Sequence, residues 1–296
     1  MASTREMRLR IRSVKNLAQV TKALETVSAS KVRRAIASAN ATRPYAERAW
    51  RVLIHLAAQP AHANLHPLLT ERKEINNIAV LLITSDRGLA GALNVNILRD
   101  TLRRFRPNHE QVNYIAVGKK GRDLLIRRGR RVIADFSGLA SPPTFLDVSP
   151  IGRMVVDDFL QGNHDQVYIA YTEFINMVRQ QPVIRKLLPL QVEDGDQPEG
   201  FQVDYANKNV VFSYEPDGSE LLDQIIPRFT ALQIYQSILS AQASEHAARM
   251  VAMRNASENA SSLVSALQLQ YNKMRQALIT NELLDIVGGS ATLAAK

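Results

Sequence analysis

The chain has 296 residues, of which 46% are hydrophobic and 22% are charged, with 13 glycines and 12 prolines. These values are typical of a globular protein of one or two domains and argue against extensive disorder. The complete absence of cysteine excludes disulfides, thiolate catalysis, iron–sulfur clusters and cysteine zinc sites.

The net charge of +9 comes from one end of the chain. Residues 1–51 hold 12 Lys and Arg against 3 acids, whereas the remaining 245 residues carry 25 of each sign. Such a basic segment favours an acidic partner, which could be nucleic acid, an anionic membrane surface or acidic protein loops. The longest apolar run, Ile78–Ile83, is far shorter than a membrane span, so we expect no membrane insertion.

The first predicted element is a long helix over residues 1–58. No Gly or Pro occurs before Pro44, and apolar residues recur at steps of three or four. Many alanines and serines give its second half small side chains, which permit close approach of a partner helix. Pro44 would kink this helix, and the pattern over Ala46–Ala58 indicates that the helix then resumes.

The spacing of apolar residues changes between residues 59 and 216, where short apolar runs alternate with amphipathic stretches. This pattern predicts an inserted, Rossmann-like α/β domain. Strands are expected at Ile78–Thr84, Val112–Val117, Val132–Phe136, Val167–Tyr171 and Val210–Tyr214. Helices are expected between the first four strands, at Ala92–Phe105, Lys119–Arg128 and Ile151–Leu160. This alternation predicts a mostly parallel sheet. The stretch Gln181–Gly200 is expected to form a strand-like arm and a loop.

The last predicted element is a second long helix, within residues 217–296. The 60 residues between Pro227 and Gly288 contain no Gly or Pro, and at ~1.5 Å per residue they would span about 90 Å. A helix of this length needs a companion to cover its apolar residues. The first helix is the only comparable partner in the sequence. The predicted fold class is therefore α/β plus a long antiparallel α-helical coiled coil formed by the N- and C-terminal helices.

Three local patterns are candidates for chemical sites. Ser85–Gly91 follows a strand and opens a helix, as a phosphate-binding loop does, but it matches neither glycine-rich fingerprint, so a tight turn capped by Ser85 or Asp86 is favoured. Gly118–Gly121 is interpreted as a turn with solvated lysines. His55, His62 and His66 lie between prolines and favour a polar connector over a zinc site. The sequence therefore predicts no catalytic residue, no cofactor and no metal, and hence no enzyme.

The basic N-terminal helix leaves an alternative open, a basic coiled-coil nucleic-acid-binding protein. Against it, the basic segment contains only two aromatic residues, Tyr45 and Trp50, and its cations are interleaved with a regular apolar pattern. That combination is more typical of one strand of a coiled coil than of a base-stacking surface. A nucleotide-binding enzyme is the weaker third hypothesis.

Several long motifs resemble one known family. They are Arg10–Asn16, Val20–Lys31, Arg43–Tyr45, Ser85–Asn94, Ser213–Asp217, Ser244–Met253, Leu267–Gln276 and Ile279–Leu283. Together they are similar to the F-type ATP synthase gamma subunit family, in the same order and over nearly the whole chain. The resemblance implies a rotary central-stalk subunit of the proton-translocating F1Fo complex, without an active site of its own. It also implies a peripheral position on the cytoplasmic face of the bacterial plasma membrane.

The resemblance further implies partners and contact residues. The coiled coil would enter the α3β3 hexamer, and the α/β domain would lie on the c-ring beside the epsilon subunit, with no nucleic acid bound. By family analogy, the residues that would contact catalytic β subunits are Arg249, Gln276, Thr280 and Glu282. Leu24 stands where the family has a methionine, close to an acidic segment of the β subunit. The basic residues Lys22, Lys31 and Arg33 would match acidic β loops. Tyr214 and Glu215 would contact the c-ring.

Overall fold

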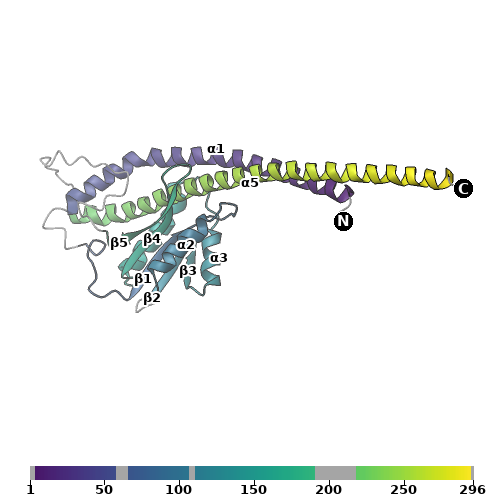
Figure 1. The fold of residues 1–296 in the computed structure, drawn as a ribbon. Coiled ribbons are helices and arrows are strands. Elements are labelled where there is room, and N and C mark those ends of the chain that lie inside the picture. Colours follow the sequence, from purple (N-terminus) through teal and green to yellow (C-terminus); the bar gives the residue numbers. More distant parts are fainter. Residues whose placement is uncertain (1–3, 58–65, 107–110, 191–217, 295–296) are drawn as a thin grey trace. The chain divides into compact units, whose positions relative to one another are not determined.

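The computed structural model describes residues 4–57, 66–106, 111–190 and 218–294 (Figure 1). Two long helices are confirmed, α1 at Thr4–Ala57 and α5 at Gly218–Ala294, and α1 continues through Pro44. The chain forms two compact units, unit 1 with Met1–Ser28 and Met250–Lys296, and unit 2 with Ala29–Arg249. The predicted domain boundaries at 58/59 and 216/217 lie outside the described residues, so that division stays a prediction.

Unit 2 contains a five-stranded sheet with the order β3-β2-β1-β4-β5. The strands are β1 (Asn77–Ile83), β2 (Gln111–Val117), β3 (Val132–Asp135), β4 (Gln166–Phe174) and β5 (Gln180–Leu188). The first four pair in parallel, as predicted, and β5 pairs antiparallel with β4. The expected arm at Gln181–Gly200 is thus a sheet strand up to Leu188. The predicted strand Val210–Tyr214 lies outside the described residues.

Three short helices connect the parallel strands, α2 (Leu93–Arg104), α3 (Lys119–Arg127) and α4 (Phe145–Leu160). Helix α4 begins six residues before the predicted start at Ile151, ahead of Pro150. The reason is a capping box: the Thr144 hydroxyl accepts from the Asp147 amide, and the Asp147 carboxylate accepts from the Thr144 amide at 2.8 Å. Satisfying both free amides stabilises a helix start that lies ahead of Pro150.

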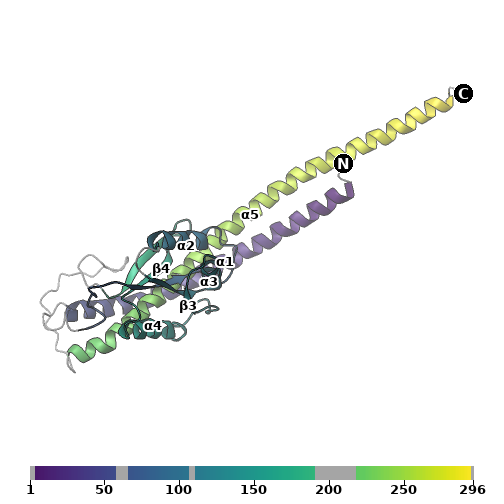
Figure 2. The same ribbon diagram turned by 90° about the horizontal axis from the view of Figure 1, so that it is seen from below.

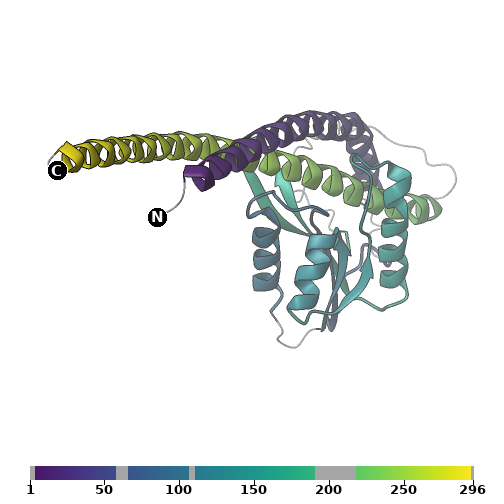
Figure 3. The ribbon, with the colours of Figure 1, turned by 90° about the vertical axis from the view of Figure 1, so that its right-hand side faces the viewer.

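The two faces of the sheet are covered by different helices (Figure 3). Alternate residues of β1 point to opposite faces. Ile78, Val80 and Leu82 belong to a core cluster with residues of α2 and α3, whereas Leu81 and Ile83 belong to a larger cluster with α4 and α5. In that larger cluster α4 and α5 pack closely, since a Cβ placed on Gly152 would lie 2.6 Å from the Cβ of Ala231. The first part of α5 is therefore a core helix of unit 2.

Unit 1 consists of the first part of α1 and the last part of α5, which lie side by side (Figure 2). Arg8 donates to the Tyr271 hydroxyl at 2.6 Å, and its guanidinium lies 5.6 Å from the centre of that ring. The Ser257 hydroxyl donates to the Ala18 carbonyl at 3.3 Å. Residue numbers rise on one helix as they fall on the other, which confirms an antiparallel pairing.

Among the described residues, no helix combines the length and apolar character needed to cross a membrane.

Candidate functional site: the surface of α5 and its junction with the sheet

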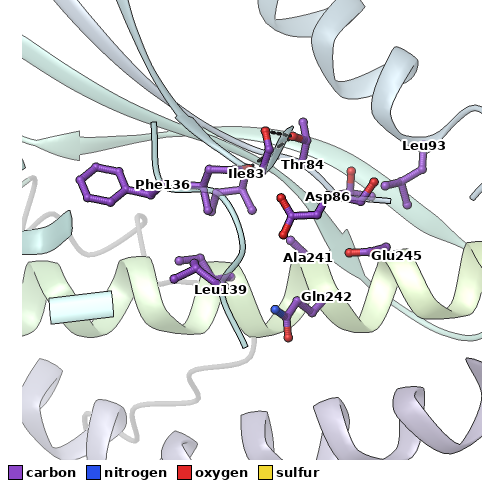
Figure 4. Close-up of a pocket in the computed structure, with 14 residues that line it drawn as sticks. Ile83, Thr84, Asp86, Leu93, Phe136, Leu139, Ala241, Gln242 and Glu245 are labelled. Carbon is purple, nitrogen blue, oxygen red and sulfur yellow. Dashed lines mark hydrogen bonds between the residues drawn. The ribbon is translucent and has the colours of Figure 1, made fainter. Parts of the chain in front are cut away.

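The carboxyl ends of the strands in unit 2 meet α5 at the place where α/β folds usually bind ligands. Such ligands bind where the strand order reverses, here between β1 and β4. In this chain α5 contributes Ala241, Gln242 and Glu245 to that place (Figure 4). The remaining cavity has a volume of about 40 Å³. That volume holds a few water molecules and is far too small for a nucleotide.

The turn after β1 is tight, as predicted, but its capping differs from the prediction. Helix α2 has Ala92 at its N-cap without a side-chain hydrogen bond. Ser85 instead donates to the Arg87 carbonyl at 2.7 Å, and Asp86 accepts from the amides of Lys119 and Gly138 at 2.9 and 3.0 Å. Asp86 thus satisfies the first amide of α3, because the fold brings that helix start beside the turn. The turn is a structural junction.

The Gly118–Gly121 motif is also structural. Gly118 has a φ of +103°, and a Cβ there would lie 2.2 Å from the Thr84 carbonyl oxygen. The Gly121 amide donates to the Thr84 hydroxyl at 2.8 Å. Glycine is needed at both positions because the end of β1 packs directly against them. Lys119 and Lys120 are exposed, as predicted.

The histidine connector is only partly described. His66 is buried, with its Nε2 2.9 Å from Asp223 Oδ1, and its Nδ1 accepts from the Leu68 amide. Burial lowers the pKa of His66, and Asp223 opposes that change. His62 and the side chain of His55 lie outside the described residues. In the part of the chain that is described, no group of three His, Cys, Asp or Glu is arranged to hold a metal ion.

Arg249 is buried inside unit 2, with only 8% of its surface exposed. Its guanidinium donates to the Glu245 carboxylate at 2.6 Å, to the Gly88 carbonyl at 3.2 Å and to the Arg87 carbonyl at 3.4 Å. It also lies 3.2 Å from His246 Nδ1. The resemblance led us to expect Arg249 on a β subunit; in this chain its donors are directed to the chain itself.

The groups around Arg249 have shifted pKa values. Burial raises the pKa of Glu245, Arg249 opposes that rise, and Asp86 adds to it. Burial, together with the nearby cations Arg249 and Lys31, lowers the pKa of His246 to about 4. His246 is therefore neutral, with Nδ1 accepting from Arg249 and Nε2 hydrogen-bonded to Ser141 at 2.8 Å.

The other predicted contact residues are spread over both units. Lys22 and Arg33 are exposed on α1, and Lys22 pairs with Glu25 at 3.0 Å. Leu24 and Lys31 are half-buried, and Lys31 is close enough to influence Glu245 and His246. Gln276, Thr280 and Glu282 are all exposed near the end of α5. Tyr214 and Glu215 lie outside the described residues.

The end of α5 exposes apolar side chains over several consecutive turns. Every residue from Arg275 to Leu284 is exposed, and Leu278, Ile279 and Leu283 expose 47%, 48% and 58% of their surfaces. In unit 1, α1 begins at Thr4, and the Arg8–Tyr271 pair is close to that start. The last part of α5 therefore carries polar and apolar side chains that no other described residue of unit 1 covers.

Sequence reasoning did not identify Glu245, His246 and Gln242 as a functional group. The spacing of Glu245 and Arg249 by four residues is a signal, but on a helix it usually marks a solvated ion pair. Only the fold brings the turn after β1 to Arg249 and makes this pair a buried junction.

Comparisons with known proteins agree with this architecture. A family model described as ATP synthase matches residues 3–293. The ATP synthase gamma chain of Roseiflexus sp. (strain RS-1) is 44% identical over 297 residues, covering 99% of both chains. That of Dehalococcoides mccartyi (strain BAV1) is 45% identical over 295 residues, covering 99% of this chain and all of the relative.

One solved structure extends the comparison to the fold. A chain in the Euglena gracilis mitochondrial ATP synthase, OSCP/F1/c-ring, matches with a TM-score of 0.69 and 20% identity, over 99% of this chain and 95% of that chain. At this identity the match concerns the fold alone. The family model and the two bacterial relatives, each matched nearly end to end, establish that the chain belongs to the ATP synthase gamma chain family.

Proposed function

We propose that the chain is the rotary central shaft of an F-type ATP synthase, which couples rotation of a membrane ring to the catalytic cycle of the surrounding subunits. The observation that carries the proposal is the exposed end of α5, on a chain that belongs to the gamma family. A helix that exposes Leu278, Ile279 and Leu283 without a cover in its own unit fits a partner that supplies one. The chain itself is a non-catalytic subunit of the complex.

The mechanism follows from one asymmetric helix pair inside a ring of three equivalent catalytic sites. A contact shifts a conformational equilibrium only by its difference in affinity for the two states. Moving a site from mostly open to mostly closed requires about 5.5 kcal/mol of such difference. Rotation carries this bias from one site to the next, so nucleotide exchange and ATP synthesis become linked to torque. Hydrolysis would run the same cycle in reverse.

For the contact residues we propose two groups. Gln276, Thr280 and Glu282 would bind the catalytic subunits, since all three are exposed beside the apolar residues at the end of α5. The exposed Lys22 and Arg33 would match acidic loops, with Leu24 and Lys31 half-buried beside them on α1. Contact of Arg249 with a β subunit stays a prediction.

We further propose that the α/β part lies on the c-ring beside the epsilon subunit, with Tyr214 and Glu215 at the ring. The complex would be proton-translocating and peripheral on the cytoplasmic face of the bacterial membrane, and the chain would bind no nucleic acid. Family membership argues against the alternative, a nucleic-acid-binding coiled coil.

The test uses the complex purified through a tag on this chain. We expect two subunits of about 50–55 kDa, sized by the family resemblance, to co-purify with the chain. Treatment with nuclease should not change the amount of either subunit that is recovered. After reconstitution into vesicles, ATP hydrolysis should acidify the lumen. A chain that co-purifies with nucleic acid and without those subunits would contradict the proposal.

A charge reversal tests the basic contacts. The double variant Lys22→Glu and Arg33→Glu should lower proton pumping per ATP hydrolysed. The matched control is Arg99→Glu with Arg103→Glu, which changes the net charge equally at two exposed positions on α2. Equal loss of pumping in both variants would show a general charge effect and would contradict these contacts.

A further inference from the structure

The guanidinium of Arg249 joins two elements that are far apart in the sequence. Its Nη2 donates to Glu245, one turn earlier on α5, and to the Arg87 carbonyl; its Nε donates to the Gly88 carbonyl. Its Nη1 lies 3.2 Å from His246 Nδ1. All three guanidinium nitrogens therefore have hydrogen-bond partners within the chain, and only 8% of Arg249 is exposed.

The turn that Arg249 holds is itself connected to the sheet. Asp86 accepts from the amide of Lys119, at the start of α3, and from the amide of Gly138, which follows β3. Ser85 follows β1 and is bound by Asn94 of α2 at 2.7 and 3.1 Å. A force on the turn is therefore shared by three strand ends, and Arg249 connects all of them to α5.

The position of this connection along α5 is also informative. Arg249 is the last residue of unit 2, and Met250 is the first residue of the second segment of unit 1. The connection therefore lies where α5 passes from one compact unit to the other. Five residues further on, Arg254 makes a similar ion pair with Glu258 at 3.2 Å, but both side chains are about two-thirds exposed and bond to no second element in the described part of the chain. The Arg249–Glu245 pair is largely buried and Arg249 also bonds to two carbonyls of the turn, whereas the Arg254–Glu258 pair is exposed.

We propose that Arg249 is a positioning residue that clamps the sheet to α5 at the end of unit 2, so that torque passes between the sheet and the shaft through the Arg87–Gly88 turn. Arg249 then acts through its contacts within this chain. The proposal rests on the proposed rotary function, and it adds the route by which the α/β part drives the helix.

The clamp requires the fork of the guanidinium, which a single ammonium group cannot replace. Lysine at this position would keep the charge and lose the separate bonds to Glu245 and to the two carbonyls. In the assembled complex, Arg249→Gln and Arg249→Lys should both speed amide exchange over residues 85–91 and lower proton pumping per ATP several-fold. The control Arg254→Gln should change neither. Unchanged exchange over the turn in both Arg249 variants would overturn the proposal.

A cross-link separates the clamp from a direct contact with β. The chain has no cysteine, so Gly88→Cys and Arg249→Cys introduce the only thiols in it. Gly88 tolerates a side chain, since its Cβ would meet only the Lys120 Cε at 3.9 Å. A short thiol-specific cross-linker should restore proton pumping in the double variant and in neither single variant.

The outcomes of the cross-link experiment are distinct. Restored pumping supports the clamp, because a covalent tether replaces the guanidinium. Pumping that stays low after complete cross-linking overturns it and favours an external role for Arg249. A wild-type complex that hydrolyses ATP without pumping would contradict the proposed rotary function itself, whatever the variants do.

Discussion

The same helix, α5, has two different environments in the two units of the molecule. In unit 2, Ile226, Ile234 and Leu239 are completely buried against the sheet and α4. In unit 1, Leu278 and Leu283 keep about half of their surfaces exposed. Both parts belong to one continuous helix, so the difference lies in what the fold provides to cover the apolar side chains. The comparison teaches that unit 2 covers its own part of α5, whereas the end of α5 in unit 1 presents a surface for a partner.

Polar groups show the same difference. In unit 2, three polar side chains of α5 bond to other elements: Gln242 donates to the Ala140 carbonyl, Tyr235 donates to the Pro143 carbonyl and the Ser240 hydroxyl accepts from the Phe174 amide. Thr230 and Ser237 of the same unit donate to the carbonyl four residues earlier. In unit 1, most serine and threonine hydroxyls of α5 bond to the carbonyl four residues earlier, as Ser261 and Thr280 do. Such local bonds satisfy the side chain without fixing the helix to anything.

The strongest test of the comparison truncates the core of unit 2. Phe159 is 1% exposed, and the Arg72 guanidinium lies 5.0 Å from the centre of its ring. Phe159→Ala should lower the free energy of unfolding by about 3–5 kcal/mol, measured by denaturant titration of the purified chain. A loss below about 1 kcal/mol would mean that the core of unit 2 is not tightly packed.

The second test uses pH to probe unit 2 alone. All six histidines lie within residues 29–249, which form that unit. The pKa of His246 is about 4 in the folded chain, against about 6.5 when unfolded. The unfolded chain therefore binds the proton first, and stability should fall as pH drops from about 6.5 to about 4. The charged groups that face His246 are Arg249 on α5 and Lys31 on α1.

The matching variant is His246→Gln, which cannot titrate. Its unfolding midpoint should depend less on pH across that window than the midpoint of the wild type. Burial also lowers the pKa values of His66 and His164. These two residues account for the pH dependence of the unfolding midpoint that remains in the variant. An identical slope in both proteins would show that His246 protonates freely in the folded state.

The third test overpacks the contact between α4 and α5. A Cβ on Gly152 would lie 2.6 Å from the Ala231 Cβ and 2.8 Å from its Cα, so one helix must move. Gly152→Ala should cost about 1–2 kcal/mol of stability, although alanine by itself favours a helix. The control is the double variant with Ala231→Gly, which should lose less than the sum of the two single changes.

The smallest effect on stability is expected at the end of unit 1. Leu283 is 58% exposed, so Leu283→Ala should change the unfolding free energy of the isolated chain by less than about 0.5 kcal/mol. In the complex, the same variant should weaken ATP-driven proton pumping, because the apolar contact with the partner is lost. A large loss of stability in the isolated chain would instead show that the segment folds against its own unit.

The sequence predicted much of the fold and only part of the candidate site. The long helices and the first four strands follow from periodicity, which is a local property, and each is present close to its expected range. The start of α4 was missed because the Thr144–Asp147 capping box, which begins the helix ahead of Pro150, was not recognised in the sequence. Exposed contact candidates such as Gln276 were found by resemblance, whereas the surroundings of Arg249 depend on the turn after β1, more than 150 residues away.

By itself, the sequence determined that two long helices flank an α/β region and that the chain resembles the gamma family. Both depend on the order and spacing of residues along the chain. Only the tertiary structure decided that α5 closes the crevice between β1 and β4 and that Arg249 is buried against the turn after β1, bonded to Gly88 and Glu245. The physical reason is that the burial and pairing of a charge depend on which distant segments fold against it, and no local pattern records that.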